Sequence, residues 1–291
     1  MSRPSWILAW VRLLRPSHYV KNILIFSPMV FGREWGIWVE TLSGFWLFCL
    51  LSSATYALND VRDAEADRHH PDKRHRPVAS GAVSPKEALG VAVALGVLSI
   101  GAGFFLKFAF GVVMALYLLN NLLYTFWLKR LALWDAFSIA GGFLLRVYGG
   151  AAIGDIRVSG YLFMTVFFLS LFLAFGKRRY ELLLLPPADH KKARYALHQY
   201  SVYYLDQLMS ISATLTLVVY VLYLMQGDFT WLMATLPVVV MGIFRYYHLT
   251  HNLQGGEPSR ELLTDPVILV MGVIFSLLSL LETLQVPLFF K

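Results

Sequence analysis

The sequence is poor in cysteine and in charge, and both shortages limit what the protein can be. Cys49 is the single cysteine among 291 residues, which excludes an internal disulfide and a zinc site built on cysteines. Only 15% of the residues are charged and 57% are hydrophobic, whereas roughly a quarter of the residues of soluble proteins are charged. The H-E-x-x-H, G-x-S-x-G and Walker motifs are also absent, so the common metalloprotease, hydrolase and P-loop chemistries have no support.

Long apolar runs recur from one end of the chain to the other, and most are close to the 20 or so residues that a membrane helix needs. Transmembrane barrels show short alternating segments instead. We therefore predict an all-α polytopic membrane protein with nine transmembrane helices, forming a single integral-membrane domain over residues 1–291. The first predicted span is short and contains Pro28, so it is expected to be tilted or broken. The predicted spans are 19–32, 39–58, 85–106, 109–128, 133–153, 159–176, 202–226, 231–248 and 266–287.

The distribution of lysine and arginine predicts the orientation of these spans. Positive residues concentrate in the loops 59–84, 129–132, 177–201 and 249–265. The opposite loops hold little beyond Arg33, Lys107 and Arg157. Because cytoplasmic loops are enriched in lysine and arginine, we predict a multi-pass protein of the cytoplasmic (inner) membrane with a cytoplasmic N-terminus.

The first residues of the chain have a different character. Arg3, Arg12 and Arg15 lie within the first apolar stretch, which has no small-residue cleavage site. A cleaved signal peptide is therefore not expected. We predict instead that residues 1–18 form an amphipathic segment lying along the membrane interface.

An acidic cluster, N-D-V-R-D-A-E-A-D at 59–67, directly follows the second predicted span. In a helix Asn59, Asp63 and Asp67 share one face, and Asp60 lies one turn from Asp63. Stacked oxygen ligands suit Mg²⁺, which takes one or two carboxylates and leaves the remaining positions to water and substrate phosphates. An isolated D-x-x-x-D would more often be a solvated loop or an arginine partner. Here the asparagine, the membrane edge and the basic run at 68–76 favour a site for Mg²⁺ and a diphosphate.

Several other polar groups fall at the same predicted side of the bundle. Lys21 and Asn22 begin the first span, Lys129 ends the fourth, and Asp135 opens the fifth. The basic run 177–179 ends the sixth, although the orientation of the protein explains its charges by itself. His69, His70 and His75 are predicted to be solvated or to contact phosphate rather than metal.

Arg146 is different because it lies well inside a predicted span. An intramembrane charge is costly, so it normally faces a cavity or pairs with a buried acid. The adjacent Gly149 and Gly150 favour a cavity, since they admit close approach of backbone or ligand.

The predicted layout and its motifs resemble the UbiA-type prenyltransferase superfamily, which has nine helices and an N-D-x-x-D-x-x-x-D motif after the second. Further segments look closer to one branch, the decaprenyl-phosphate phosphoribosyltransferases. They are L-R-P-S-H-Y-V-K-N (14–22), Y-A-L-N-D-V-R-D-A-E-A-D-R-H-H-P-D-K-R-H-R-P-V-A-S-G (56–81), F-L-L-R-V-Y-G-G-A-A (143–152), F-G-K-R-R-Y-E-L (175–182) and G-G-E-P-S-R-E-L-L-T-D (255–265).

One departure from the superfamily pattern supports this branch. Typical members that use a prenyl diphosphate carry a second D-x-x-x-D after the sixth helix. Here 177–206 has only Asp189 and Asp206, in no such spacing, and offers the basic run 177–179 instead. A lipid monophosphate needs cationic donors more than a second metal ion, and arginine supplies a bidentate fork.

The resemblance implies transfer of 5-phosphoribosyl from 5-phosphoribosyl 1-diphosphate to a polyprenyl phosphate, with inversion at C1. The product would be a lipid-linked phosphoribose precursor for cell-envelope arabinan or related glycans. Catalytic roles are expected for Asp60, Asp63 and Asp67, and Mg²⁺ ligation for Asn59 and Asp63. Donor binding is expected for Lys21, Tyr56, Lys73, Lys129 and Arg146, and lipid-phosphate binding for Arg146, Lys177 and Arg178.

Two other functions remain open on the sequence alone. A prenyltransferase that moves a prenyl group from its diphosphate to an aromatic acceptor is the nearer alternative. A transporter of anionic solutes is the other, although its site is expected near the bilayer midplane and only Arg146 lies deep. The expected partners are membrane lipids and the two substrates, with the active site on the cytoplasmic face. Nucleic acid is not an expected partner, and homo-oligomerisation and site roles for Tyr203, Tyr204 and Asp206 are left open.

Overall fold

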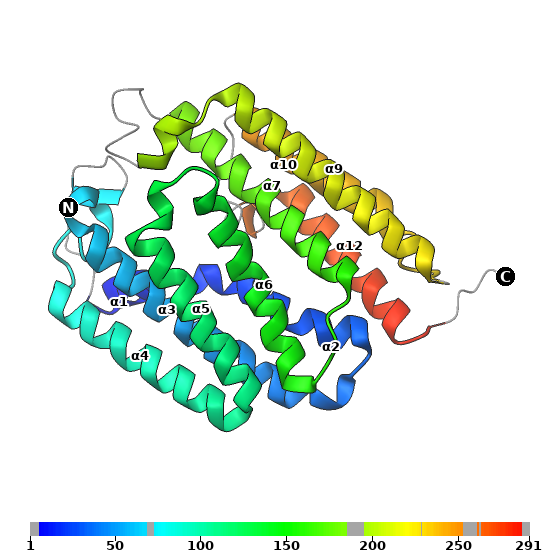
Figure 1. Cartoon of the computed structure of the whole chain (residues 1–291), viewed down its shortest axis with the longest axis horizontal. Helices are drawn as coiled ribbons and strands as arrows, with labels where there is room; N and C mark the ends of the chain where they lie inside the picture. The colour runs from blue at the N-terminus through cyan, green and yellow to red at the C-terminus, as the bar shows by residue number, and fades with distance from the viewer. Residues whose placement is uncertain are drawn as a thin grey trace.

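The computed structural model describes residues 6–68, 73–184, 195–227, 229–252, 261 and 263–286, and every regular element within them is helical, as predicted (Figure 1). The elements are α1 (Trp6–Leu14), the 3₁₀ helix η1 (Pro16–Phe26), α2 (Ser27–Gly32), η2 (Trp35–Ile37), α3 (Trp38–Arg68), η3 (Lys73–His75), α4 (Pro85–Leu106), α5 (Phe108–Phe126), η4 (Leu128–Arg130), α6 (Trp134–Gly154), α7 (Gly160–Leu184), η6 (Tyr195–Gln199), α9 (Val202–Gln226), α10 (Thr235–His251) and α12 (Pro266–Thr283).

Among the described residues, seven helices are long and apolar enough to cross a membrane: α3 together with η2, α4, α5, α6, α7, α9 and α12. Two predicted spans are not in this set. The eighth is α10, which has 17 residues, and the first is divided between η1 and α2. The predicted bounds 85–106 and 202–226 coincide with α4 and α9.

The N-terminal segment Pro16–Gly32 reaches farther than its length suggests. A 3₁₀ helix rises about 2.0 Å per residue, so the 11 residues of η1 extend about 22 Å. The six residues of α2 add about 9 Å at 1.5 Å each. At one end Arg15 bonds Asp60, and at the other Arg33 lies 3.8 Å from the Glu282 carboxylate. The segment therefore runs between the end of α3 that carries the acidic motif and the last turn of α12.

Consecutive helices pack side by side through most of the bundle (Figure 1). The contacts run from α3 to α4, α5, α6, α7 and α9 in turn, and α10 packs against α12. η1 lies against both α3 and α6, while α2 contacts α6 and α12. The N-terminal segment thereby connects the first helices of the bundle with the last.

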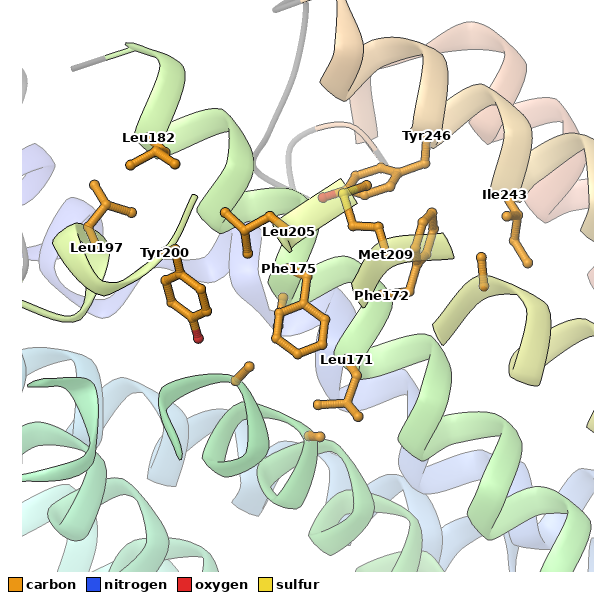
Figure 2. Close-up of a cluster of buried hydrophobic side chains, with 14 residues drawn as sticks. Leu171, Phe172, Phe175, Leu182, Leu197, Tyr200, Leu205, Met209, Ile243 and Tyr246 are labelled. Atoms are coloured by element: carbon orange, nitrogen blue, oxygen red, sulfur yellow. The ribbon is translucent and has the colours of Figure 1, made fainter. Parts of the chain in front are cut away.

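Figure 2 shows one apolar core, formed where α7, α9 and α10 meet beside η6. Phe172 and Phe175 come from α7, Leu205 and Met209 from α9, and Tyr246 from α10. All five are at least nine-tenths buried. Burial of large apolar side chains stabilises this side of the bundle. The same packing fixes the position of α7, which carries the basic run 177–179.

Two glycines of α6 explain how η1 and α3 come so close to that helix. A Cβ at Gly150 would lie 1.8 Å from the carbonyl oxygen of Ile25, and one at Gly149 would lie 2.6 Å from Phe48. No larger residue fits without a shift of η1 or α3. We expected Gly149 and Gly150 to admit either backbone or a ligand. The structure shows that protein atoms of η1 and α3 occupy the space beside them.

Two helices continue beyond their predicted spans, and the difference bears on the site. α3 continues through the acidic motif to Arg68, and α7 continues through 177–179 to Leu184. The acidic motif and the basic run 177–179 therefore lie on helices, which fix the directions of their side chains. α1 packs Ala9 and Leu13 inward and exposes Trp6 and Ile7, and its interfacial placement stays a prediction.

Candidate anion-binding site

A polar cavity of about 220 Å³ lies between η1, α3, α5, α6 and α7. It brings together six of the predicted site residues: Lys21, Tyr56, Asn59, Arg146, Lys177 and Arg178. Three basic side chains that the sequence did not single out for the site, Arg15, His18 and Arg76, also line it. Its neutral polar wall is formed by Thr55, Tyr117, Asn120, Asn121, Tyr124, Thr125, Ser138 and Ser170.

The acidic motif divides into two pairs of side chains. Because successive helical residues are turned by about 100°, Asn59 and Asp63 point toward one side of α3, and Asp60 and Asp67 toward the next. Asn59 and Asp63 face Lys129 on η4. Asp60 and Asp67 face Arg76, and Asp60 also bonds Arg15.

The Asn59–Asp63 pair fits a divalent cation. Lys129 Nζ lies 2.5 Å from Asp63 Oδ1 and 3.5 Å from Asn59 Oδ1, so both oxygens already converge on a positive charge. No group of three His, Cys, Asp or Glu side chains in the described part of the chain could hold a metal ion. The remaining ligands would have to be water or substrate phosphate, the arrangement that Mg²⁺ favours.

Arg146 occupies the floor of the cavity with only 4% of its surface exposed. Its guanidinium donates to Asn22 Oδ1 at 2.7 Å, to the Gly142 carbonyl at 2.7 Å and to Tyr117 Oη at 2.8 Å. All three acceptors are neutral, and among the described residues Arg146 forms no ion pair with a carboxylate. Since buried charges are normally paired, an anion that enters the cavity supplies what this arginine lacks.

The three basic residues of α7 point in different directions. Lys177 and Arg178 line the cavity, whereas Arg179 is not part of its lining and bonds Asp206 and the Thr250 carbonyl. Arg178 is fully buried and donates to Asp135 at 2.7 Å and to Glu181 at 2.6 Å. The guanidinium is therefore held in a fixed position by two carboxylates.

Tyr200 completes the support of Arg178. Its hydroxyl donates to Asp135 Oδ1 at 2.9 Å and accepts from the Leu133 N–H at 2.6 Å. Burial, followed by the charge of Asp135, raises the pKa of this phenol well above its usual range. The hydroxyl therefore stays protonated, and its hydrogen bond holds Asp135 toward Arg178.

Some predicted residues lie away from the cavity wall. Lys73 lies in η3 and Lys129 lies in η4, 3.5 Å from Asn59, and neither lines the cavity. Tyr203 and Tyr204 are exposed on α9, and neither is among the lining residues. His69, His70 and Asp189 lie outside the described residues.

The spacing of the sequence contained a signal for two of the lining residues that we did not predict, Arg15 and His18. Arg15, His18 and Lys21 are spaced by three residues, which aligns them in a 3₁₀ helix but not in an α-helix. Runs of 3₁₀ helix longer than three or four residues are uncommon, so the spacing alone did not predict that these side chains share one face. Arg76 directly follows η3, and nothing in its spacing indicated the contact with Asp60.

Together these features define a helical membrane protein with a cation-rich cavity beside a carboxylate–amide pair. The model of the UbiA prenyltransferase family matches residues 23–264. The chain therefore belongs to the UbiA prenyltransferase family, and with its apolar helices it is a multi-pass membrane protein.

The chain is also similar to two curated decaprenyl-phosphate phosphoribosyltransferases. The protein of Corynebacterium glutamicum is 32% identical, with 96% of this chain and 88% of the relative covered. The protein of Mycobacterium tuberculosis is 34% identical, with 90% of each covered. The predicted resemblance to the family and to this branch is confirmed.

Solved structures confirm the fold. A UbiA homolog from Archaeoglobus fulgidus, determined with GPP and Mg²⁺ bound, superposes with a TM-score of 0.73. It covers 95% of this chain and 98% of its own, at 18% identity. At that identity the likeness establishes the architecture alone.

Proposed function

We propose that this protein transfers 5-phosphoribosyl from 5-phosphoribosyl 1-diphosphate to a polyprenyl phosphate. The observation that carries the proposal is Arg146, a buried arginine whose partners in the described structure are all neutral, on the floor of a cavity lined by further cations. Such a cavity suits the meeting of two anionic substrates. The names of the curated relatives, decaprenyl-phosphate phosphoribosyltransferases, support the same choice of substrates.

The donor diphosphate would bind beside Asn59 and Asp63. Mg²⁺ bound there would neutralise charge on the leaving diphosphate; the Mg²⁺ in the Archaeoglobus structure supports this choice of ion. Lys129, which now contacts both oxygens, would then turn toward the phosphates, as would Lys21 and Lys73. Tyr56 lies one turn before Asn59 and would contact the donor between its charged ends.

The acceptor phosphate would bind at the opposite wall of the cavity. Lys177 and Arg178 reach this wall from α7 and Arg146 from α6. Arg178 is held by Asp135 and Glu181, so its guanidinium is positioned before the lipid arrives. Prepositioned donors lose little entropy on binding and favour the reactive arrangement.

The chemistry requires no general base, because the nucleophile is already an anion. A lipid phosphate oxygen forms a bond to C1 as the bond from C1 to the diphosphate oxygen breaks and diphosphate leaves with the electron pair. Attack from the face opposite the leaving group inverts C1. The cationic side chains hold the two anions near one another and so offset their mutual repulsion.

The remaining expectations concern the whole chain. We propose that residues 1–291 act as one integral-membrane domain with nine passes, in which Pro16–Gly32 and α10 complete the seven longer spans. The N-terminus and the cavity would face the cytoplasm, in the inner membrane. The product would be a lipid-linked phosphoribose used in cell-envelope glycans.

A transfer assay tests the proposed function. Purified protein is incubated with donor labelled in the ribose, a polyprenyl phosphate and Mg²⁺, and the organic phase is counted. Label in the organic phase that depends on both the lipid and Mg²⁺ is the expected result. No transfer of label, together with consumption of a prenyl diphosphate in the presence of an aromatic acceptor, would establish the alternative reaction.

A further inference from the structure

Arg15, His18 and Lys21 form a row along η1 that faces the cavity. A 3₁₀ helix has three residues per turn, so side chains three apart are eclipsed. Arg15 caps η1 with a left-handed backbone conformation, φ 53°, which is strained for a residue other than glycine. This strained turn and the uncommonly long 3₁₀ helix together aim three basic side chains at one surface.

Arg76 approaches the same surface from the chain that follows η3. Its Nη1 lies 2.8 Å from Asp67 and 3.5 Å from Asp60, and Arg15 Nη2 lies 2.5 Å from Asp60. One carboxylate, Asp60, thus holds both guanidiniums. The Asp60 side chain is only 1% exposed, against 18% for Arg15 and 26% for Arg76. The carboxylates lie behind the arginines, and the arginines face the cavity.

This arrangement leaves donors for a ligand. A guanidinium has five N–H donors, and in the described part of the chain the ion pairs use only Nη2 of Arg15 and Nη1 of Arg76. Two planar forks held side by side match the oxygens of a phosphate group. Tyr56 lies beside them, 5.2 Å from the Arg15 guanidinium and 5.2 Å from the His18 ring.

The two arginines flank the same end of α3 as the Asn59–Asp63 pair but on the adjacent face. We propose that Arg15 and Arg76 form a second anion subsite that recognises a phosphomonoester, the 5-phosphate of the donor, while the diphosphate occupies the Asn59–Asp63 side. The proposal rests on the proposed function and deepens it. A prenyl diphosphate has a single charged end, so the subsite selects a phosphorylated sugar over a prenyl donor.

Competition by the two halves of the donor tests this subsite. Inhibition of transfer by ribose 5-phosphate and by inorganic diphosphate with Mg²⁺ is measured for wild type, Arg76→Gln and Arg15→Gln. Each arginine variant should weaken inhibition by ribose 5-phosphate about tenfold or more, because hydrogen bonds from a charged group are lost. Inhibition by diphosphate should change less than about threefold, which also shows that the variant is folded.

Two further variants complete the design. Arg74→Gln alters an exposed arginine beside the subsite and should leave both inhibition constants unchanged. Arg76→Lys retains the charge near Asp60 and Asp67 but not the planar fork. If Arg76→Gln does not fold, the two inhibition constants are compared in Arg76→Lys instead. If the wild type transfers phosphoribose, two results would overturn the subsite alone. Inhibition by ribose 5-phosphate and by diphosphate would weaken equally in the arginine variants, or neither would weaken. A wild type without transfer activity would instead overturn the proposed function.

Discussion

Arg146 and Arg178 are both buried arginines on the cavity wall, but their partners differ. Arg146 has three neutral acceptors, whereas Arg178 lies between Asp135 and Glu181. Removing one member of a buried ion pair strands the other charge and costs about 3–5 kcal/mol. No carboxylate is stranded in the described structure when Arg146 is removed, so its charge serves binding more than stability.

Arg146→Gln and Arg178→Gln form a matched test of this difference. Arg178→Gln should lower the free energy of unfolding by about 3–5 kcal/mol, because Asp135 loses its partner. Arg146→Gln should lower it by about 2 kcal/mol or less, because the loss of its three hydrogen bonds is offset by removal of a buried charge. It should nevertheless reduce transfer roughly 100-fold. Thermal unfolding in detergent and initial rates give the two numbers. Equal destabilisation by both variants would contradict the distinction.

Asp63→Ala separates metal binding from folding. Asp63 is part of the proposed Mg²⁺ site and partly exposed, with Lys129 as its partner. Turnover that depends on Mg²⁺ should fall roughly 100- to 1,000-fold, with little change in the unfolding temperature. Glu65→Ala, an exposed carboxylate of the same helix, is the control and should keep wild-type activity. Near-normal activity of Asp63→Ala across a Mg²⁺ titration would exclude the metal assignment.

Among the helices, η1 influences the cavity directly, because its position sets the direction of Arg15, His18 and Lys21. η1 lies between α3 and α6, and Gly150 allows its backbone to contact α6 directly. Asn22, fully buried in η1, bonds Arg146 of α6 and thereby connects the helix position with the cavity floor. A shift of η1 would therefore move Arg15, His18 and Lys21 together.

Gly150→Ala tests the packing of η1. The added Cβ meets the Ile25 carbonyl, and such overpacking costs about 1–3 kcal/mol. We expect a lower unfolding temperature together with a higher KM for the donor, because the η1 row moves. Gly96→Ala on α4 adds a Cβ that has no atom within 4 Å, and it should be neutral or stabilising by roughly 0.5–1 kcal/mol. A Gly150→Ala protein with wild-type stability and KM would show that η1 tolerates displacement.

Much of the architecture could be predicted because membrane helices have a strong apolar signal. The bounds of α4 and α9 agree with the prediction, and the acidic motif lies on a helix as expected. The 3₁₀ helix could not be predicted, because its winding depends on packing against α3 and α6 rather than on local preference. The sequence placed Asp60 and Asp67 in one acidic cluster with Asn59 and Asp63, but it could not show that Arg15 and Arg76 are their tertiary partners.

For the whole molecule, the orientation in the membrane is the main remaining prediction. Cys49 is buried, and its replacement by alanine gives a background without cysteine. In that background Lys86→Cys, at the start of α4, and Arg157→Cys, between α6 and α7, lie at opposite ends of the bundle, and both positions are exposed. An impermeant thiol reagent applied to intact cells should label position 157 and not position 86. The reverse pattern would place the cavity on the outer face.

In the proposed reaction, one cavity joins a phosphoribosyl group to a lipid phosphate and releases diphosphate. Donor that carries ³²P in the 5-phosphate and ³³P in the diphosphate measures this directly. With polyprenyl phosphate and Mg²⁺, we predict that ³²P enters the organic phase while an equal molar amount of inorganic diphosphate appears in water. Both labels remaining in water, or both entering the lipid, would exclude transfer of phosphoribose with release of diphosphate.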